Sequence, residues 1–169
     1  EVDESFASVS EALTDRYMAL YPKTKINLKI KKEDFAFLDL LEGKVRVIVM
    51  SRELNESEKK AYKKETTLDW LPAKFAADAV VFIVPKNSPK ETITIDEIRN
   101  ELNNDKKNII FDGTNSSNLN FVAQKLNTKP DQLRFSIING NKNLIEQLNA
   151  FPDKIGVISL NTISRPYDP

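Results

Sequence analysis

The chain has 169 residues, of which 40% are hydrophobic, and its 25 Lys and Arg balance its 25 Asp and Glu. This composition can fill a globular core, and the neutral total excludes the global basic field that gathers nucleic acid or an anionic membrane surface. Because Cys and His are both absent, disulfides, thiolate chemistry, most zinc sites and the usual neutral-pH proton shuttle are excluded as well.

The first third of the chain predicts a helix, a strand and a second helix. Residues 6–21 place apolar side chains three or four apart, which indicates an amphipathic helix that lies on a sheet and ends at Pro22. Residues 25–32, "KINLKIKK", alternate as a half-exposed or edge strand does. Residues 34–44 predict a helix capped by Asp34 and stopped by Gly43.

The middle of the chain predicts a strand at 45–51, "VRVIVMS", and a mostly charged helix after it. That helix begins with the capping-box spacing of Asn55 and Glu58, and a later helix at 94–103 repeats it with Thr94 and Glu97. Between them, residues 71–85 form a long extended segment. Its most apolar part, 76–85, is interrupted by Asp78 and is about half the length of a membrane span.

Strands and helices continue to alternate to the end of the chain. Strands are expected at 108–112, 133–139 and 155–161, with helices beginning near residue 115 and spanning 142–151. This alternation predicts an α/β protein with parallel sheets covered on both faces by crossover helices. If the chain has two lobes, the extended residues 71–84 are the candidate boundary.

Small polar side chains gather where predicted strands lead into helices. Ser5, Ser51 and the run Asn115, Ser116, Ser117 stand at such junctions, where backbone amides and the helix dipole suit a bound anion. Each residue could instead be an ordinary helix cap. Arg52, directly after Ser51, is either a solvated charge or a forked donor for a tetrahedral oxyanion.

No catalytic constellation is visible in the sequence. Without His or Cys, a hydrolase that used Ser116 or Ser117 would lack a general base. The phosphate loop of nucleotide hydrolases, the dinucleotide glycine pattern and the nucleophile elbow are also missing. The acidic segments are typical of first helical turns, and the basic ones of exposed surface. We therefore expect no enzyme, cofactor, metal ion or nucleic-acid partner.

Several motifs together resemble a known family. The order "DESF", "LLEGKVRVIVMSRELNESE", "ADAVVFIVPKNSP", "TIDEI" and "IIFDGTNSSNLNFV" resembles the phosphate-binding, PstS-like substrate-binding proteins of bacterial ABC importers, most of all the group found in Bacteroidetes. The match covers nearly the whole chain. The resemblance implies a two-lobed, periplasmic-binding-protein-like (type II) fold, with parallel-rich sheets flanked by helices and hinge strands between the lobes. The implied boundaries are 1–77 for lobe I, incomplete at both ends, 78–161 for lobe II, and 162–169 for a segment that returns to lobe I.

The resemblance also assigns roles to individual residues. Ser5 matches the first anion-binding loop, Ser51 the second, and Asn115, Ser116 and Ser117 match the helix start that grips phosphate. The family's proton-accepting Asp follows the second-loop Ser, and here that position is Arg52. An Arg of the family is replaced by Phe111. Arg52 would then supply the missing cation, and the acceptor for the phosphate proton would be Asp112, Asp3 or no residue, so a weaker preference for phosphate over sulfate is expected.

The implied function is capture of phosphate or a similar oxyanion in an interlobe cleft, without catalysis, by a monomer that delivers it to the permease of an ABC importer. The implied location is the periplasm or cell envelope, with a lipid anchor in a segment that precedes this chain. The alternative is a ligand-sensing or protein-interaction module on the same two-lobed fold, because a fold does not fix a function.

Overall fold

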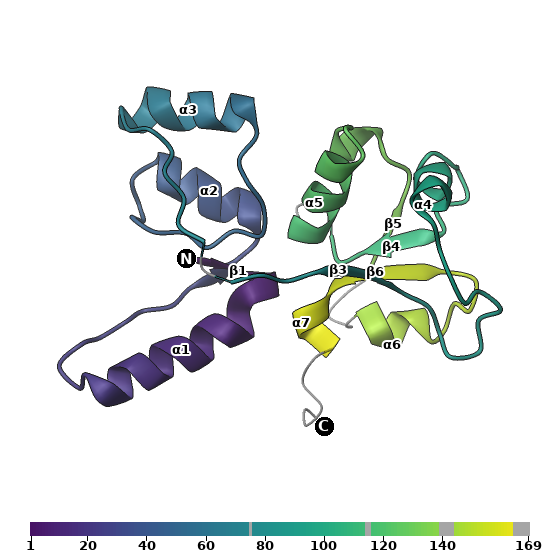
Figure 1. Ribbon diagram of the computed structural model, residues 1–169, viewed down its shortest axis with the longest axis horizontal. Helices are drawn as coiled ribbons and strands as arrows, with labels where there is room; N and C mark the ends of the chain where they lie inside the picture. The colour runs from purple at the N-terminus through teal and green to yellow at the C-terminus, as the bar shows by residue number, and fades with distance from the viewer. Residues whose placement is uncertain (75, 114–115, 139–143, 164–169) are drawn as a thin grey trace. The chain divides into compact units, whose positions relative to one another are not determined.

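The structure, a computed structural model, describes residues 1–74, 76–113, 116–138 and 144–163. The chain forms two compact units, Glu1–Ala77 and Asp78–Pro169. The first unit contains β1 (Val2–Asp3), the 3-10 helix η1 (Glu4–Phe6), α1 (Ala7–Leu20), β2 (Ile30–Lys31), α2 (Glu33–Leu41) and α3 (Glu56–Thr66). Within it, α2 and α3 lie on one side of β1 and α1 on the other (Figure 1).

A small parallel arrangement of three segments organises the first unit. β1 pairs in parallel with β2, with Val2 opposite Ile30, and Val2 also forms a parallel bridge with Val49. The Asp3 amide donates to the Val49 carbonyl at 3.0 Å, and the Val49 amide donates to the Glu1 carbonyl at 2.9 Å. The carboxyl ends of three chain segments therefore meet at one edge, and η1, α2 and the loop at Ser51 begin there.

Three sequence predictions for this unit were wrong, and the first is the strand expected at 25–32, of which only Ile30–Lys31 is paired, as β2. The strand expected at 45–51 is reduced to the single bridge at Val49, because β1 is two residues long and offers no longer partner. The helix cap expected at Asp34 is absent, because the N-cap of α2 is Lys32, two residues earlier, which makes no side-chain capping bond. Gly43 does end this helix region with a φ of 70°, a conformation that glycine adopts without strain.

Arg52 connects the two helices above the strands. Its Nε lies 2.7 Å from Glu33 Oε1 at the start of α2, and its Nη1 and Nη2 each donate at 2.8 Å to the carboxylate of Glu58 in α3. The Nε–H is not aligned for a hydrogen bond, so the contact with Glu33 is an ion pair. Glu58 also completes the predicted capping box with Asn55, which is confirmed. A buried ionic cluster thus holds α2 and α3 together.

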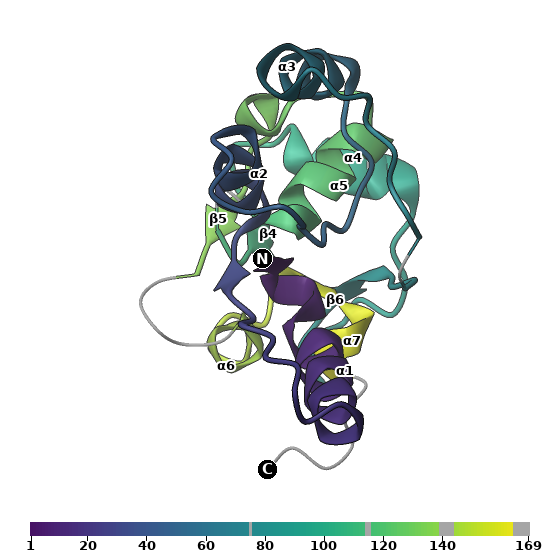
Figure 2. The ribbon, with the colours of Figure 1, turned by 90° about the vertical axis from the view of Figure 1, so that its left-hand side faces the viewer.

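The second unit is a four-stranded sheet covered on both faces. It contains β3 (Val80–Ile83), α4 (Ile95–Leu102), β4 (Ile109–Phe111), α5 (Ser117–Lys125), the 3-10 helix η2 (Pro130–Gln132), β5 (Ser136–Ile137), α6 (Leu144–Leu148), β6 (Ile155–Ser159) and α7 (Leu160–Ile163). The strand order is β3-β6-β4-β5. Figures 1 and 2 show α4 and α5 on one face of this sheet and α6 and α7 on the other.

Alternation along the strands divides the core of this unit into two clusters. Ile109 and Phe111 of β4 point to the face under α4 and α5, where they join Ile98, Leu102, Leu119, Val122, Ala123, Leu133, Ile155 and Val157. Ile110 points to the other face and packs with Leu144, Leu148 and Ile158. The predicted α/β class with helices around parallel-rich sheets is confirmed, although β3 runs antiparallel to β6.

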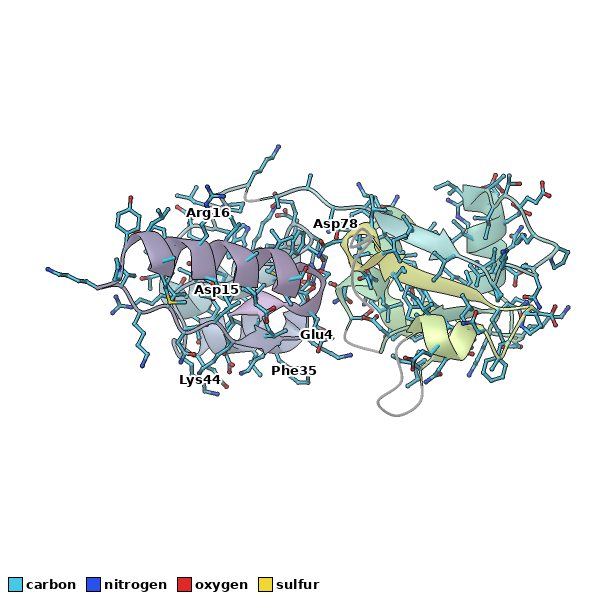
Figure 3. The ribbon with its side chains drawn as sticks, turned by 90° about the horizontal axis from the view of Figure 1, so that it is seen from below. Glu4, Asp15, Arg16, Phe35, Lys44 and Asp78 are labelled. Atoms are coloured by element: carbon cyan, nitrogen blue, oxygen red, sulfur yellow. The ribbon has the colours of Figure 1, made fainter. Side chains whose placement is uncertain are left out.

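The surface of the first unit carries charged side chains of α1 and some apolar ones. Figure 3 marks Asp15 and Arg16 on α1, and Phe35 and Lys44 on and after α2; all four are exposed. Ser10 is the only buried residue of α1, so the predicted apolar face of this helix packs on β1 only in part. No helix in the described parts of the chain is both long and apolar enough to cross a membrane.

Gly156, the second residue of β6, allows a test of the packing of α6 against the sheet. A Cβ built there would lie 2.3 Å from Leu144 Cδ2 and 3.1 Å from Ile83 Cγ1. We expect Gly156→Ala to lower the free energy of unfolding by about 1–3 kcal/mol, as overpacking does. The measurement is denaturant unfolding of the parent and the variant. In a Leu144→Ala background the same change should cost much less; an equal cost in both backgrounds would contradict the packing described for α6.

The ionic cluster predicts how stability depends on pH. Desolvation alone would raise the pKa of Glu58, but the hydrogen bonds from Arg52 and from the Asn55 backbone outweigh it and hold that pKa below its ordinary value of 4.5. A carboxyl whose pKa is lower in the folded state contributes stability above its unfolded pKa and loses it as the pH falls through the folded pKa.

We therefore expect the stability difference between the parent and Glu58→Gln to be constant near neutral pH and to shrink as the pH falls below 4.5. The amide oxygen of Gln can keep the capping-box hydrogen bond, whereas its NH₂ group cannot accept from Arg52 Nη2, so the variant removes the charge and one hydrogen bond while the helix cap stays. The measurement is the free energy of unfolding of both proteins over this range. A difference that does not change with pH would show that the Arg52–Glu58 pair contributes nothing.

Candidate functional site

The carboxyl edge of the first unit brings three sequence elements together. Ser5 lies in η1 directly after β1, Glu33 opens α2 after β2, and Ser51 follows the bridge residue Val49. The register of β1 with β2 and with Val49 places these segments side by side. Carboxyl ends of parallel strands are the usual ligand-binding edge of α/β sheets. The edge therefore presents hydroxyl and carboxylate groups rather than apolar side chains.

Ser51 and Arg52 both contact the same carboxylate. The Ser51 hydroxyl donates to Glu33 Oε2 at 3.1 Å, while Arg52 Nε lies 2.7 Å from Glu33 Oε1. The side chain of Glu33 is fully buried, and that of Arg52 is 6% exposed. Ser51 itself is half-buried and can be reached from solvent. The two residues predicted to bind an oxyanion are thus already joined through a buried anion of the protein.

The guanidinium of Arg52 is surrounded by acceptors. Besides Glu33 and Glu58, the Glu53 carbonyl accepts from Nη1 at 3.1 Å. Burial acts to lower the pKa of Arg52, but the hydrogen bonds with Glu58 and the charges of Glu33 and Glu58 raise it above its ordinary value. To bind a ligand directly, Arg52 would have to give up part of these contacts. Its role in the structure is to compensate two carboxylates.

Ser5 repeats the arrangement of Ser51. Both its amide, at 3.0 Å, and its hydroxyl donate to Asp3 Oδ1, which caps η1. Asp3 is 1% exposed, whereas Ser5 is half-buried. Asp3, one of the predicted acceptors for a ligand proton, is therefore a buried partner of Ser5.

The second unit supplies the other predicted hydroxyl groups. Ser116 is the N-cap of α5, and its hydroxyl oxygen accepts from the Leu119 amide at 3.2 Å. Ser117 and Asn118 open the helix, and all three polar residues are less than 10% exposed. Asn115 lies outside the described residues. The polar run thus includes a true helix cap, followed by two further buried polar side chains at the same helix start.

Phe111 and Asp112 are the two positions at the end of β4 to which the family resemblance drew attention. Phe111, which stands where the family has an Arg, is fully buried and packs edge-on against Phe135 with ring centroids 5.4 Å apart. Asp112 follows it at the end of β4 and is half-buried. Phe111 therefore contributes to the core of this unit and offers no charge to an anion.

Sequence reasoning missed Glu33. It stands eighteen residues from Ser51 along the chain, and no local pattern joins them. Its position directly after a predicted strand, at the start of a helix, was nevertheless the same signal that singled out Ser5 and Ser51. The expected Asp34 cap drew attention to the neighbouring residue instead.

The groups at these strand ends can form several hydrogen bonds to one ligand. The edge of the first unit offers hydroxyl oxygens backed by carboxylates, and the start of α5 offers hydroxyl groups and helix amides. Within the described parts of the chain, no group of three or more Asp and Glu is arranged to hold a metal ion. Hydroxyls and helix amides suit a polyoxygen anion that can both donate and accept hydrogen bonds.

Comparison with known proteins agrees with the fold. A family model described as a PBP superfamily domain matches residues 1–167. A sequence comparison with curated proteins gives no match. Among solved structures, the chain is similar to a Clostridium perfringens protein described as a phosphate ABC transporter substrate-binding protein with bound phosphate. That match has a TM-score of 0.74 and 20% identity, and covers 94% of this chain and 69% of the other.

Two further structures have a similar fold. An ABC-type phosphate transport receptor from Vibrio cholerae matches with a TM-score of 0.65 and 18% identity, over 95% of this chain and 71% of the receptor. PstS from Borrelia burgdorferi matches with a TM-score of 0.52 and 19% identity, over 94% and 69% of the two chains. At these identities the likeness shows a shared fold. Because the family model spans nearly the whole sequence, the chain belongs to the PBP superfamily, which confirms the periplasmic-binding-protein-like part of the resemblance drawn from its motifs.

Proposed function

We propose that this protein captures inorganic phosphate or a similar oxyanion, without catalysis, and delivers it to the permease of an ABC importer. The observation that carries the proposal is the set of hydroxyl groups at the carboxyl ends of strands. In the first unit, Ser5 and Ser51 lie at the carboxyl ends of paired segments. In the second unit, Ser116 and Ser117 lie after the carboxyl end of β4. Such edges bind ligands in α/β sheets, and helix starts favour anions.

The printed descriptions of the similar structures support the same ligand. The Clostridium perfringens protein contains bound phosphate, and the Vibrio cholerae protein is described as a phosphate transport receptor. By analogy, we propose that the protein works as a monomer in the periplasm or cell envelope, held there by a lipid anchor. The absence of His and Cys agrees with a binding role, because it removes the usual acid–base and nucleophilic groups.

Individual residues enter this proposal in different ways. Ser116 and Ser117 would contribute hydroxyl and amide donors from the start of α5, and Asn115 would extend that set. Ser51 and Ser5 would contribute hydroxyl oxygens from the first unit. Arg52 would support the site indirectly, by neutralising Glu33, because its donors already meet Glu33, Glu58 and the Glu53 carbonyl.

Calorimetric titration with phosphate, sulfate, molybdate and a carboxylate tests the function. We expect saturable phosphate binding by the parent and at least fivefold weaker binding, on the order of 1 kcal/mol, by Ser117→Ala, because one buried hydrogen bond to the ligand is lost. The matched control is Ser136→Ala in the same unit, whose hydroxyl donates to the Lys107 carbonyl at the amino end of β4.

Ser136→Ala should bind phosphate as the parent does. If the parent binds no oxyanion, the proposed function is wrong. If the two Ser variants bind phosphate equally tightly, the assignment of the ligand site to the start of α5 is wrong although phosphate binding itself stands. Circular dichroism of each variant before titration checks that the fold is kept.

A further inference from the structure

The hydroxyl of Ser51 has a fixed hydrogen-bond polarity. It donates to Glu33 Oε2 at 3.1 Å. A serine hydroxyl carries one hydrogen and two lone pairs, so a hydroxyl that donates to one group can only accept from another. A ligand that reaches Ser51 while this hydrogen bond persists therefore meets lone pairs rather than a donor.

The surroundings of Glu33 keep the Ser51 hydroxyl as a donor to Glu33. Its side chain is fully buried, and Arg52 Nε lies 2.7 Å from its other carboxylate oxygen. A neighbouring guanidinium favours the ionised carboxylate, which accepts hydrogen bonds and donates none. Hydrogen bonds to a carboxylate are also stronger than those between neutral groups. The hydroxyl hydrogen of Ser51 is thus kept on the side of Glu33.

Glu33 and Ser51 differ in how accessible they are to a ligand. Glu33 is inaccessible, whereas Ser51 is half-buried. We propose that Glu33 is a positioning residue that makes Ser51 a hydrogen-bond acceptor, so that the site selects oxyanions that still carry a proton over fully ionised ones. This inference rests on the proposed function, since it concerns the same ligand and the same edge.

Ser5 and Asp3 form a second pair of the same kind. The Ser5 hydroxyl donates to the buried Asp3 carboxylate, and Asp3 and Glu33 both stand at the ends of paired parallel strands. Two hydroxyl groups predicted to bind the anion are therefore each backed by a buried carboxylate. Simple anion binding would favour hydroxyl groups that point their hydrogens at the ligand. The repetition indicates an edge that requires a donor on the ligand.

Hydrogen phosphate and sulfate are the matched probes for this idea. At mildly alkaline pH both are dianions of similar size and shape, and they differ in the one proton that phosphate retains. Phosphate can donate that proton to Ser51 Oγ, whereas sulfate would place an oxygen against lone pairs with no hydrogen between them. The protein should therefore discriminate between them without any carboxylate in direct contact with the ligand.

The decisive variant is Glu33→Gln. The guanidinium of Arg52 faces Oε1, so the amide oxygen of Gln takes that side and its NH₂ group faces Ser51. The NH₂ group then donates to Ser51 Oγ, and the hydroxyl hydrogen is released toward the ligand. We expect the ratio of phosphate to sulfate affinity to fall by about tenfold, mainly through tighter sulfate binding, because one repulsive contact becomes a hydrogen bond.

Two further variants separate polarity from charge and from folding. Glu58→Gln removes a carboxylate from the same Arg52 but leaves the Ser51–Glu33 hydrogen bond in place. It should leave the affinity ratio unchanged. Ser51→Ala, which tests the idea even where Glu33→Gln does not fold, should weaken phosphate binding several-fold and leave sulfate binding unchanged or tighter, because the acceptor for the phosphate proton and the lone pairs that oppose sulfate are lost together.

Titration calorimetry of all four proteins with both anions gives distinguishable results. The inference is overturned if the parent binds phosphate and sulfate equally, if Glu33→Gln and Glu58→Gln change the ratio alike, or if Ser51→Ala weakens both anions by the same factor. If the parent binds neither anion, the proposed function fails and the inference fails with it. Only a parent that prefers phosphate, with the ratio lowered by Glu33→Gln and Ser51→Ala but not by Glu58→Gln, supports the proposal.

Discussion

The need to compensate one buried carboxylate governs the architecture of the first unit. Glu33 is fully buried at the start of α2, and a buried charge is tolerated only when it is paired and hydrogen-bonded. Ser51 and Arg52 meet this need from a segment that has little strand pairing of its own, and Arg52 extends the cluster to Glu58 in α3. The loop after Val49, the start of α2 and the start of α3 are therefore fixed by the same charges.

The two units are stabilised in different ways. The second unit has a four-stranded sheet with an apolar cluster on each face, so its strand ends are held by packing. The first unit pairs only two short strands and a bridge residue, and its buried side chains include Asp3, Glu33 and Asp39. Hydrogen bonds and ion pairs depend strongly on geometry, whereas apolar packing is non-directional. The carboxyl edge of the first unit, where Ser5, Glu33 and Ser51 lie, is therefore set by directional contacts.

The sequence predicted the local features of the fold better than the non-local ones. The capping boxes at Asn55 and Thr94 were correct, because a few neighbouring residues contain all the information for a helix start. The strand at 45–51 was wrong, because strand length depends on a partner, and β1 offers only two residues. Ser51 and Arg52 were chosen from their position after a strand, but the carboxylate they share is eighteen residues away. A motif can reveal which residues reach the edge; only tertiary contacts reveal whether their hydrogens are free for a ligand.

The direction of the hydrogen bond between Ser51 and Glu33 bears on the presence of Arg at position 52, where the family resemblance leads us to expect an Asp. By family analogy, the replacement of an Asp by Arg removes the group that accepts a ligand proton. In this fold the cation instead pairs with Glu33, and Glu33 takes the hydrogen of Ser51. A carboxylate can thus act on a ligand through a hydroxyl that it polarises, without touching the ligand and without adding an exposed negative charge to an anion site. Arg52 and Glu33 then work as a pair, because the guanidinium compensates the buried carboxylate and that carboxylate takes the hydrogen of Ser51.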